Sequence, residues 1–315
     1  MTKHHIQWAA IAAIAVFSLG KTYAGDNVWA SAPTWNQSND TDGLSIRKAS
    51  VTALPSYTSG LKWKGVEWQE QRYQQNGNTL NGHGVNYIAQ DIDPLTGLGQ
   101  SLKVGVNQGP EKTTLIGDWS YNQAYNKQLS WGGFASRDWV ESMSALKQGI
   151  HFDLIGANVD YQVHSRITLV GSLAQTHFSD GHDRQQQRFR SVWDALPDHG
   201  ITLQWAYKHQ IGETIADASQ RFYFNPDRLD ESMGLIGWRR RYEGWQWYAR
   251  LGAGSQRVNT DDHTPARLAE MQLSSPVHGD SFFKMRAGRS ESAGLSGPGY
   301  VYRYLELQWV WRLSR

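Results

Sequence analysis

The chain has 315 residues, enough for one large barrel or two ordinary domains. It carries 31 basic and 29 acidic residues, and the formal net charge of +2 argues against binding of nucleic acid or another polyanion as its main task. There is no cysteine, which excludes disulfide frameworks, thiolate metal sites and cysteine nucleophiles. The mean hydropathy of −0.58 excludes a bundle of transmembrane helices.

The N-terminus has the order of a secretory signal peptide. Lys3 and two histidines precede an apolar stretch from Trp8 to Leu19, and the small residue Ala24 follows. The alternative, an anchoring helix, is disfavoured because the apolar stretch is short. We therefore expect a signal peptide over residues 1–24 and a mature domain over residues 25–315, outside the bacterial inner membrane.

The rest of the chain alternates apolar and polar residues with the period of two that is typical of β-strands. In the clearest segment, near the C-terminus, one face carries Leu305, Leu307, Trp309, Trp311 and Leu313 and the other Tyr304, Glu306, Gln308 and Arg312. Each segment has about ten residues, the length that a tilted strand needs to cross a bilayer. Sixteen strands are predicted: 32–39, 43–54, 61–73, 79–91, 99–108, 112–121, 127–137, 152–162, 165–177, 184–195, 200–210, 229–241, 246–256, 266–275, 280–290 and 300–313.

The connections between these segments support a membrane barrel. From the seventh strand on, tight connections after the eighth, tenth, twelfth and fourteenth strands alternate with longer ones, of which residues 211–228 form the longest. Short periplasmic turns, longer outer loops and an even number of strands are typical of outer-membrane barrels. The sequence thus predicts an all-β fold, a transmembrane antiparallel β-barrel of about 16 strands in the bacterial outer membrane. A soluble periplasmic β-domain is the alternative.

The faces of the strands indicate what each side contacts. Trp and Tyr occur near strand ends, as in the aromatic girdles of membrane barrels, and examples are Trp63, Trp131, Trp247 and Trp311. The other face is too polar to pack dry, so we expect it to line a wet lumen. Alternation in the last strands gives eight candidate lumen residues that would contact a substrate. They are Tyr248, Arg250, Lys284, Arg286, Tyr302, Tyr304, Glu306 and Arg312.

One local motif raises the possibility of an enzyme. His177 and Ser179 are two residues apart on one strand, so both side chains face the same side, and the histidine could deprotonate the serine. The spacing resembles the His-x-Ser-Asn-Gly motif of outer-membrane phospholipases, but Asp180 stands where that family has Asn, and the orienting Asn expected near Ser191 is missing. No catalytic, metal or cofactor site is therefore predicted, and a lipid hydrolase is kept as the weaker alternative.

Four short motifs, in order, resemble the barrel domains of exopolysaccharide-export porins of the poly-N-acetylglucosamine and cellulose type. The matching segments are Asn39-Asp40-Thr41-Asp42-Gly43, Phe178-Ser179-Asp180-Gly181-His182-Asp183-Arg184, Arg221-Phe222-Tyr223-Phe224-Asn225-Pro226-Asp227-Arg228 and Gly252-Ala253-Gly254-Ser255-Gln256. The resemblance implies a sixteen-stranded barrel that passes a polysaccharide through a passive lumen. It also implies that Ser179-Asp180-Gly181 form an outer turn. Apart from the resemblance, the aromatic residues 222–224 followed by Asn225-Pro226 predict a turn with a packed plug.

The chain departs from the well-known members of that family because no 34-residue helical repeat precedes the barrel. If it exports a polymer, the periplasmic scaffold would be a separate protein. The expected partners are then outer-membrane lipid, a polysaccharide and such a scaffold, with no nucleic acid. A general diffusion porin, or a surface receptor barrel without dedicated cargo, is the main alternative function.

Overall fold

The computed structural model describes residues 28–313 except 214–216, 218–220, 279 and 296. The expected signal peptide lies outside the described residues. Sixteen strands follow one another in the predicted order, and their bounds are β1 (Val28–Asp40), β2 (Ser45–Ser59), β3 (Lys62–Gln75), β4 (Asn78–Ile92), β5 (Gly99–Gln108), β6 (Thr113–Ala124), β7 (Leu129–Trp139), β8 (His151–His164), β9 (Ile167–Phe178), β10 (Asp183–Leu196), β11 (Ile201–Gly212), β12 (Arg228–Tyr242), β13 (Trp245–Val258), β14 (Thr264–Ser274), β15 (Ser281–Gly294) and β16 (Gly297–Leu313). Two short helical segments, α2 (Met143–Gln148) and η1 (Pro197–His199), lie between strands. None of the helices in the described part of the chain is long and apolar enough to cross a membrane.

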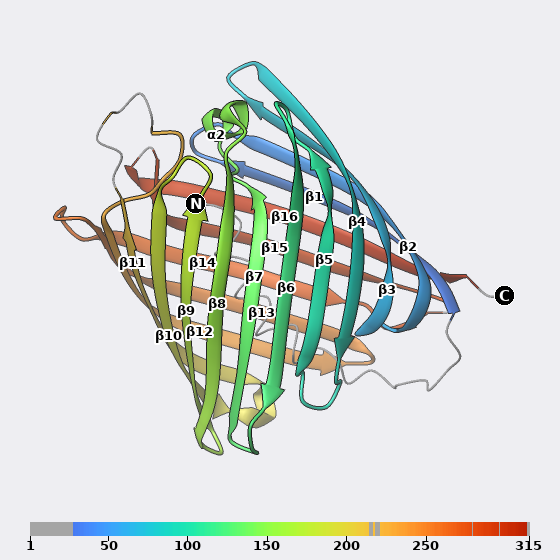
Figure 1. Ribbon diagram of the computed structural model, residues 1–315. Helices are drawn as coiled ribbons and strands as arrows, with labels where there is room; N and C mark the ends of the chain where they lie inside the picture. Colours follow the sequence, from blue (N-terminus) through green and yellow to red (C-terminus); the bar gives the residue numbers. More distant parts are fainter. Residues whose placement is uncertain (1–27, 214–216, 218–220, 279, 296, 314–315) are drawn as a thin grey trace.

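The strands form one closed barrel in which each pairs antiparallel with its sequence neighbours (Figure 1). The ring closes where β1 pairs with β16, with Trp35 opposite Leu307 and Ser38 opposite Tyr304. Closure satisfies the backbone hydrogen bonds of both terminal strands, which lipid could not do. The predicted fold class and strand number are confirmed.

Apolar side chains face outward and polar side chains face inward on most strands. On β3, a segment whose alternation is weak in the sequence, Val66 and Trp68 are half exposed on the outside, while Gln69 and Gln71 are buried inside. An outward apolar face with a buried polar one is the reverse of a soluble β-barrel. Hydrocarbon is therefore the medium that the outer face fits.

The two rims of the barrel differ in their connections. The two longest connections, 140–150 and 213–227, both lie at the rim that carries α2 (Figure 1). The opposite rim has tight turns such as 165–166 and the Glu243-Gly244 turn, whose residues have φ of 47° and 82°. Because outer-membrane barrels place their longer loops outside the cell, we call the rim with α2 the outer rim and the other the inner rim.

The regular alternation of loop lengths predicted from the sequence is only partly correct. The connection after β15 is short, at 295–296, because β15 and β16 extend toward each other beyond their expected ends. The connection after β14, expected to be tight, spans 275–280. Cross-strand backbone pairing continues past the apolar band, where the hydrophobic pattern no longer marks the strand.

Part of the barrel interior is filled. Near the inner rim an apolar interior cluster is formed by Ala30, Ala32, Leu54, Tyr57, Ile88, Phe282 and Val310, all at most 9% exposed. Nearer the outer rim, Lys103 Nζ lies 2.5 Å from Glu67 Oε1, and Lys48 Nζ lies 2.6 Å from Glu141 Oε1. The lumen next to β1, β2 and β3 is thus filled, and the open space lies on the other side of the barrel.

We expect an arginine to be costly on the outer face and tolerated on the inner face. Leu251 is 64% exposed at the middle of β13, and Ser172 of β9 lines the lumen. Replacing Leu251 with Arg should lower the free energy of unfolding in lipid vesicles by about 3 kcal/mol, whereas Ser172→Arg should cost about 1 kcal/mol or less. Denaturant titration of both variants measures this, and equal losses would contradict the assignment of the faces.

Candidate functional site

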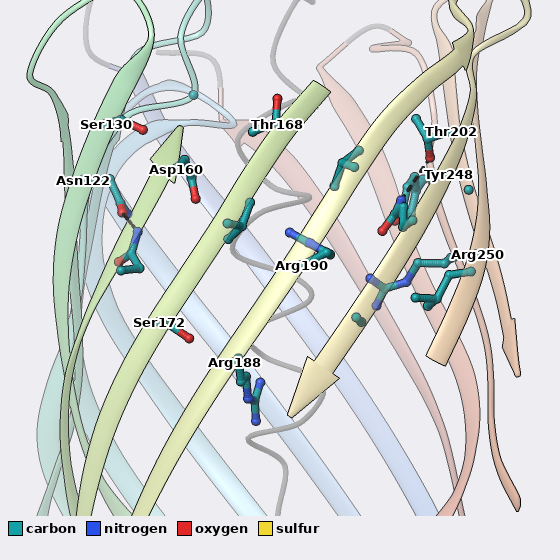
Figure 2. Close-up of a pocket in the computed structure, with 18 of the residues that line it drawn as sticks. Asn122, Ser130, Asp160, Thr168, Ser172, Arg188, Arg190, Thr202, Tyr248 and Arg250 are labelled. Atoms are coloured by element: carbon teal, nitrogen blue, oxygen red, sulfur yellow. Dashed lines mark hydrogen bonds between the residues drawn. The ribbon is translucent and has the colours of Figure 1, made fainter. Parts of the chain in front are cut away.

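The lumen encloses a cavity of about 1250 Å³ on the side of the barrel away from the apolar interior cluster. Its walls are formed by strands β4 to β16, of which β15 contributes only its end near the outer rim. The inner-rim turns at 95–99 and 126–129 line one end of the cavity. Figure 2 shows Asp160, Arg190 and Tyr248 pointing into this space from three different strands.

One wall of the cavity is rich in uncharged amides and hydroxyls, apart from the Asp160 carboxylate of β8, and we call it the neutral wall. Asn158 Nδ2 of β8 donates to Asn122 Oδ1 of β6 at 2.9 Å (Figure 2). The hydroxyls of Ser101 and Ser120 are 2.8 Å apart, and Ser172 follows on β9. Such groups both donate and accept hydrogen bonds without carrying charge. They can therefore exchange water for the hydroxyls of a passing solute at little electrostatic cost.

The facing wall, from β10 to β14, is charged. Arg188 and Arg190 of β10 project into the cavity with Arg250 of β13 (Figure 2). Arg250 Nη2 lies 3.0 Å from Glu270 Oε1, and both side chains are about 5% exposed. A buried ion pair of this kind holds both side chains in place, because removing either partner leaves a buried charge.

A second ion pair lies on the same wall. Lys208 Nζ of β11 is 3.9 Å from Glu231 Oε2 of β12. Glu231 also accepts a hydrogen bond from the Ser292 hydroxyl at 3.0 Å. The wall therefore combines arginine and lysine donors with carboxylate acceptors, while Tyr248 and Tyr304 add aromatic faces.

The structure divides the eight candidate lumen residues into two groups. Tyr248, Arg250 and Tyr304 line the cavity. The other five pack elsewhere. Lys284 lies over the Phe282 ring and Arg312 over the Tyr57 ring, and both rings belong to the apolar interior cluster. Arg286 forms an ion pair with Glu306 at 3.8 Å, and the buried Tyr302 stacks on Tyr304.

Several lining residues were not among the sequence candidates. Arg188 and Arg190 alternate with Phe189, Ser191 and Trp193 in the predicted strand 184–195. This alternation could have assigned both arginines to the face that lines the lumen. The neutral wall of Asn122, Asn158 and Ser172 had no such marker, because isolated polar residues in a strand do not show where the lumen is open.

The two long connections of the outer rim pack against each other over part of the mouth. Ser142 caps α2 by accepting from the Ala145 backbone N–H at 3.2 Å, and Gly149 ends the helix with a φ of 63°. The hydroxyls of Ser142 and Ser144 both donate to the Phe222 carbonyl oxygen. We call residues 140–150 together with 221–227 the outer cap.

An aromatic contact anchors the outer cap to the strands. The Tyr223 ring stacks on Phe178 with a centroid distance of 4.4 Å, and its hydroxyl donates to Asp180 Oδ1 at 2.9 Å. Burial, together with the Asp180 carboxylate, raises the pKa of Tyr223 far above its usual value, so this hydrogen bond persists at all physiological pH values. The segment 222–224 is packed, as the aromatic motif indicated.

The described contacts do not form a hydrolase site at His177 and Ser179. His177 Nδ1 lies 3.0 Å from Asp183 Oδ1 on the outside of the barrel. The Ser179 hydroxyl oxygen accepts from the His151 backbone N–H at 3.1 Å and lies in the outer turn 179–182. Within the residues described, no group of three His, Cys, Asp or Glu side chains is placed to hold a metal ion.

Comparison with known proteins supports the fold. No protein-family model matches the sequence, and no curated protein sequence matches it. The structure is similar to a bacterial polysaccharide outer membrane secretin, with a TM-score of 0.67, 11% identity, and coverage of 91% of this chain and 99% of that one. CdiB from Acinetobacter baumannii gives a TM-score of 0.49 at 10% identity over 91% of this chain and 60% of that one. OccAB2 from Acinetobacter baumannii gives 0.45 at 9% identity over 94% and 100% of the two chains.

At such low identity the likeness to the secretin shows the fold alone. Together with the closed ring of sixteen strands, the outward apolar face and the polar side chains of the lumen, it defines the class of protein. The chain folds as a sixteen-stranded β-barrel of the bacterial outer-membrane type, and a cavity with many polar lining residues lies in its lumen.

Loss of the Tyr223 anchor should loosen the outer cap. Replacing Tyr223 with Ala removes both the stack on Phe178 and the hydrogen bond to Asp180, and we expect trypsin to cleave after Lys147 of α2 about tenfold faster. Tyr223→Phe keeps the stack on Phe178, so its cleavage rate should lie between those of the wild type and Tyr223→Ala. Tyr125→Ala, which removes an exposed ring in an inner-rim turn, is the control, and an equal effect of that variant would contradict the anchor.

Proposed function

We propose that this barrel passes an exopolysaccharide through the outer membrane to the cell surface. The observation that carries the proposal is the construction of the cavity, in which a neutral wall of amides and hydroxyls faces a charged wall with two tyrosine rings. Sugars present hydroxyls on their edges and apolar C–H groups on their faces. The neutral wall fits the edges, and Tyr248 and Tyr304 fit the faces.

The contacts that such a wall offers are numerous and individually weak. A polymer that slides must bind well enough to enter and loosely enough to leave, so many replaceable contacts serve transport better than one tight site. Asn122, Asn158 and Ser172 offer contacts of this kind at successive strands, and water can bridge the longer gaps. The movement that we propose is passive: the polymer slides along these contacts without a chemical step.

The likeness to a polysaccharide secretin over nearly the whole barrel supports this choice by analogy of fold. The motif resemblance to exopolysaccharide-export porins points the same way. A periplasmic scaffold on a separate chain would deliver the polymer to the inner rim, where the turns at 95–99 and 126–129 open onto the cavity.

A general diffusion porin is the second candidate, and one observation favours it. The cavity mixes both signs of charge with neutral groups and has no single dominant subsite, as a sieve for small hydrophilic solutes would.

Deletion of the protein separates the two functions. Export predicts that the secreted polysaccharide accumulates in the periplasm of the deletion strain, as measured by sugar analysis of periplasmic and surface fractions. Complementation with Tyr248→Ala should restore about a fifth of the surface polymer, because one aromatic face for the sugar is lost. Complementation with Tyr87→Ala, which removes an outward ring of β4, should restore all of it.

Two results would contradict export. One is normal surface polymer in the deletion strain. The other is full recovery with Tyr248→Ala when that variant is present at the wild-type level. Diffusion of small solutes is then measured as conductance of the purified barrel in planar bilayers, where a diffusion porin conducts whether or not defined oligosaccharides are added.

A further inference from the structure

Five arginines form a row on the outside of the barrel near the outer rim. They lie on β14, β15, β16, β2 and β3, which with β1 are six consecutive strands of the ring. All five are exposed, and on each strand the neighbouring residues face the interior. We call this set the outer arginine row, and its members are Arg267, Arg289, Arg303, Arg47 and Arg72.

Two pairs within the row are in direct cross-strand register. Arg47 of β2 is opposite Arg72 of β3, and Arg289 of β15 is opposite Arg303 of β16. Like charges directly opposite on one face of a sheet destabilise it. Two such pairs, separated by β1 alone, are stabilised by neutralising carboxylates or by an external anion.

The carboxylates near the row are too few to neutralise it. Glu291 lies 3.2 Å from Arg267 and 3.9 Å from Arg289. Glu70 lies two residues from Arg72 on the same outer face and forms no ion pair with a described residue. The same holds for three arginines of the row, Arg47, Arg72 and Arg303. On β1, between the two pairs, Gln37 is opposite Arg47 and Asn39 is opposite Arg303, so the gap carries neutral hydrogen-bond donors.

The rest of the outer rim is built differently. Across β7 and β8, Arg137 forms a two-pronged ion pair with Asp153, with Nη2 and Oδ2 2.6 Å apart. On β11 and β12, Asp230 accepts from Arg228 at 2.5 Å and lies 2.7 Å from His209 Nδ1. On that side Arg137 and Arg228 have carboxylate partners, and Arg257 of β13 is bound by the backbone carbonyls of Thr260 and Asp261. Three arginines without an ion pair to a described residue, Arg47, Arg72 and Arg303, lie together on the six strands of the row.

The row stands at the edge of the apolar band. Below it toward the inner rim, the same outer face carries Val66 and Trp68 on β3 and Leu307, Trp309 and Trp311 on β16, all exposed. Side chains that hydrocarbon covers therefore end where the arginines begin. This is the depth at which the phosphate groups of the outer leaflet lie.

We propose that the outer arginine row binds a phosphorylated glycolipid of the outer leaflet, of the lipid A type. Each in-register arginine pair holds one phosphate between two guanidinium groups, whose planar donors match phosphate oxygens in bidentate hydrogen bonds. The acyl chains lie on the apolar face directly below. A free phosphate would satisfy the charge but would gain nothing from this face, so the surface fits a lipid. The site does not depend on what passes through the lumen.

Binding of lipid A to the purified barrel in detergent, measured by native mass spectrometry and by titration, tests the proposal. We expect Arg47→Gln with Arg72→Gln to weaken binding about tenfold, and Arg289→Gln with Arg303→Gln to weaken it by a similar factor. The control is Arg137→Gln with Asp153→Asn, which removes matched charges at the same level on the other side of the barrel and should leave the affinity unchanged. Retention of the folded, heat-modifiable gel mobility shows that the variants form barrels.

Three results would overturn the site. The first is equal affinity for lipid A and for its enzymatically dephosphorylated form. The second is equal affinity of the wild type and both arginine-pair variants. The third is displacement of bound lipid A by millimolar inorganic phosphate, which would show that the row recognises a free anion rather than a lipid.

Discussion

The structure depends on one constraint: a backbone in hydrocarbon has no water to bond to, so every strand must find two neighbours. The pairing of β1 with β16 meets that requirement and makes a ring of what would otherwise be a sheet with two open edges. Once the ring is closed, alternation along each strand assigns one side chain to lipid and the next to the lumen. The outward tryptophans, the polar lining and the arginines at the membrane boundary are all consequences of that division.

The lumen that results is uneven, and this unevenness matters for transport. The apolar interior cluster and the Lys48–Glu141 and Lys103–Glu67 ion pairs fill the lumen next to β1, β2 and β3, so the space open to a solute is the cavity lined by β4 to β16. There it meets a neutral wall and a charged wall at once. The Lys48–Glu141 pair also ties the outer cap to β2, which couples the shape of the mouth to the packed side of the barrel.

Much of the fold was predictable because lipid imposes a period of two over about ten residues, and a pattern that strict survives in a single sequence. Loop lengths were less predictable, since the ends of β15 and β16 are held by backbone pairing beyond the apolar band. For the site, alternation assigns a residue to a face but does not say whether that face meets open space. Lys284 and Arg312 differ from Arg250 in this respect because aromatic rings fill the space beside them. Phe282 lies two residues from Lys284 on β15, whereas Tyr57 comes from the opposite end of the chain to Arg312. The outer arginine row was also invisible, because a net charge of +2 conceals where the charges gather.

The central claim is that lipid solvates every second side chain of these strands. Nitroxide labels placed one at a time from Arg303 to Trp309 of β16, in lipid vesicles, test it most directly. Oxygen, which partitions into lipid, should broaden labels at 305, 307 and 309, and a water-soluble nickel complex should broaden labels at 304, 306 and 308. Equal accessibility of odd and even positions to the two reagents would contradict it.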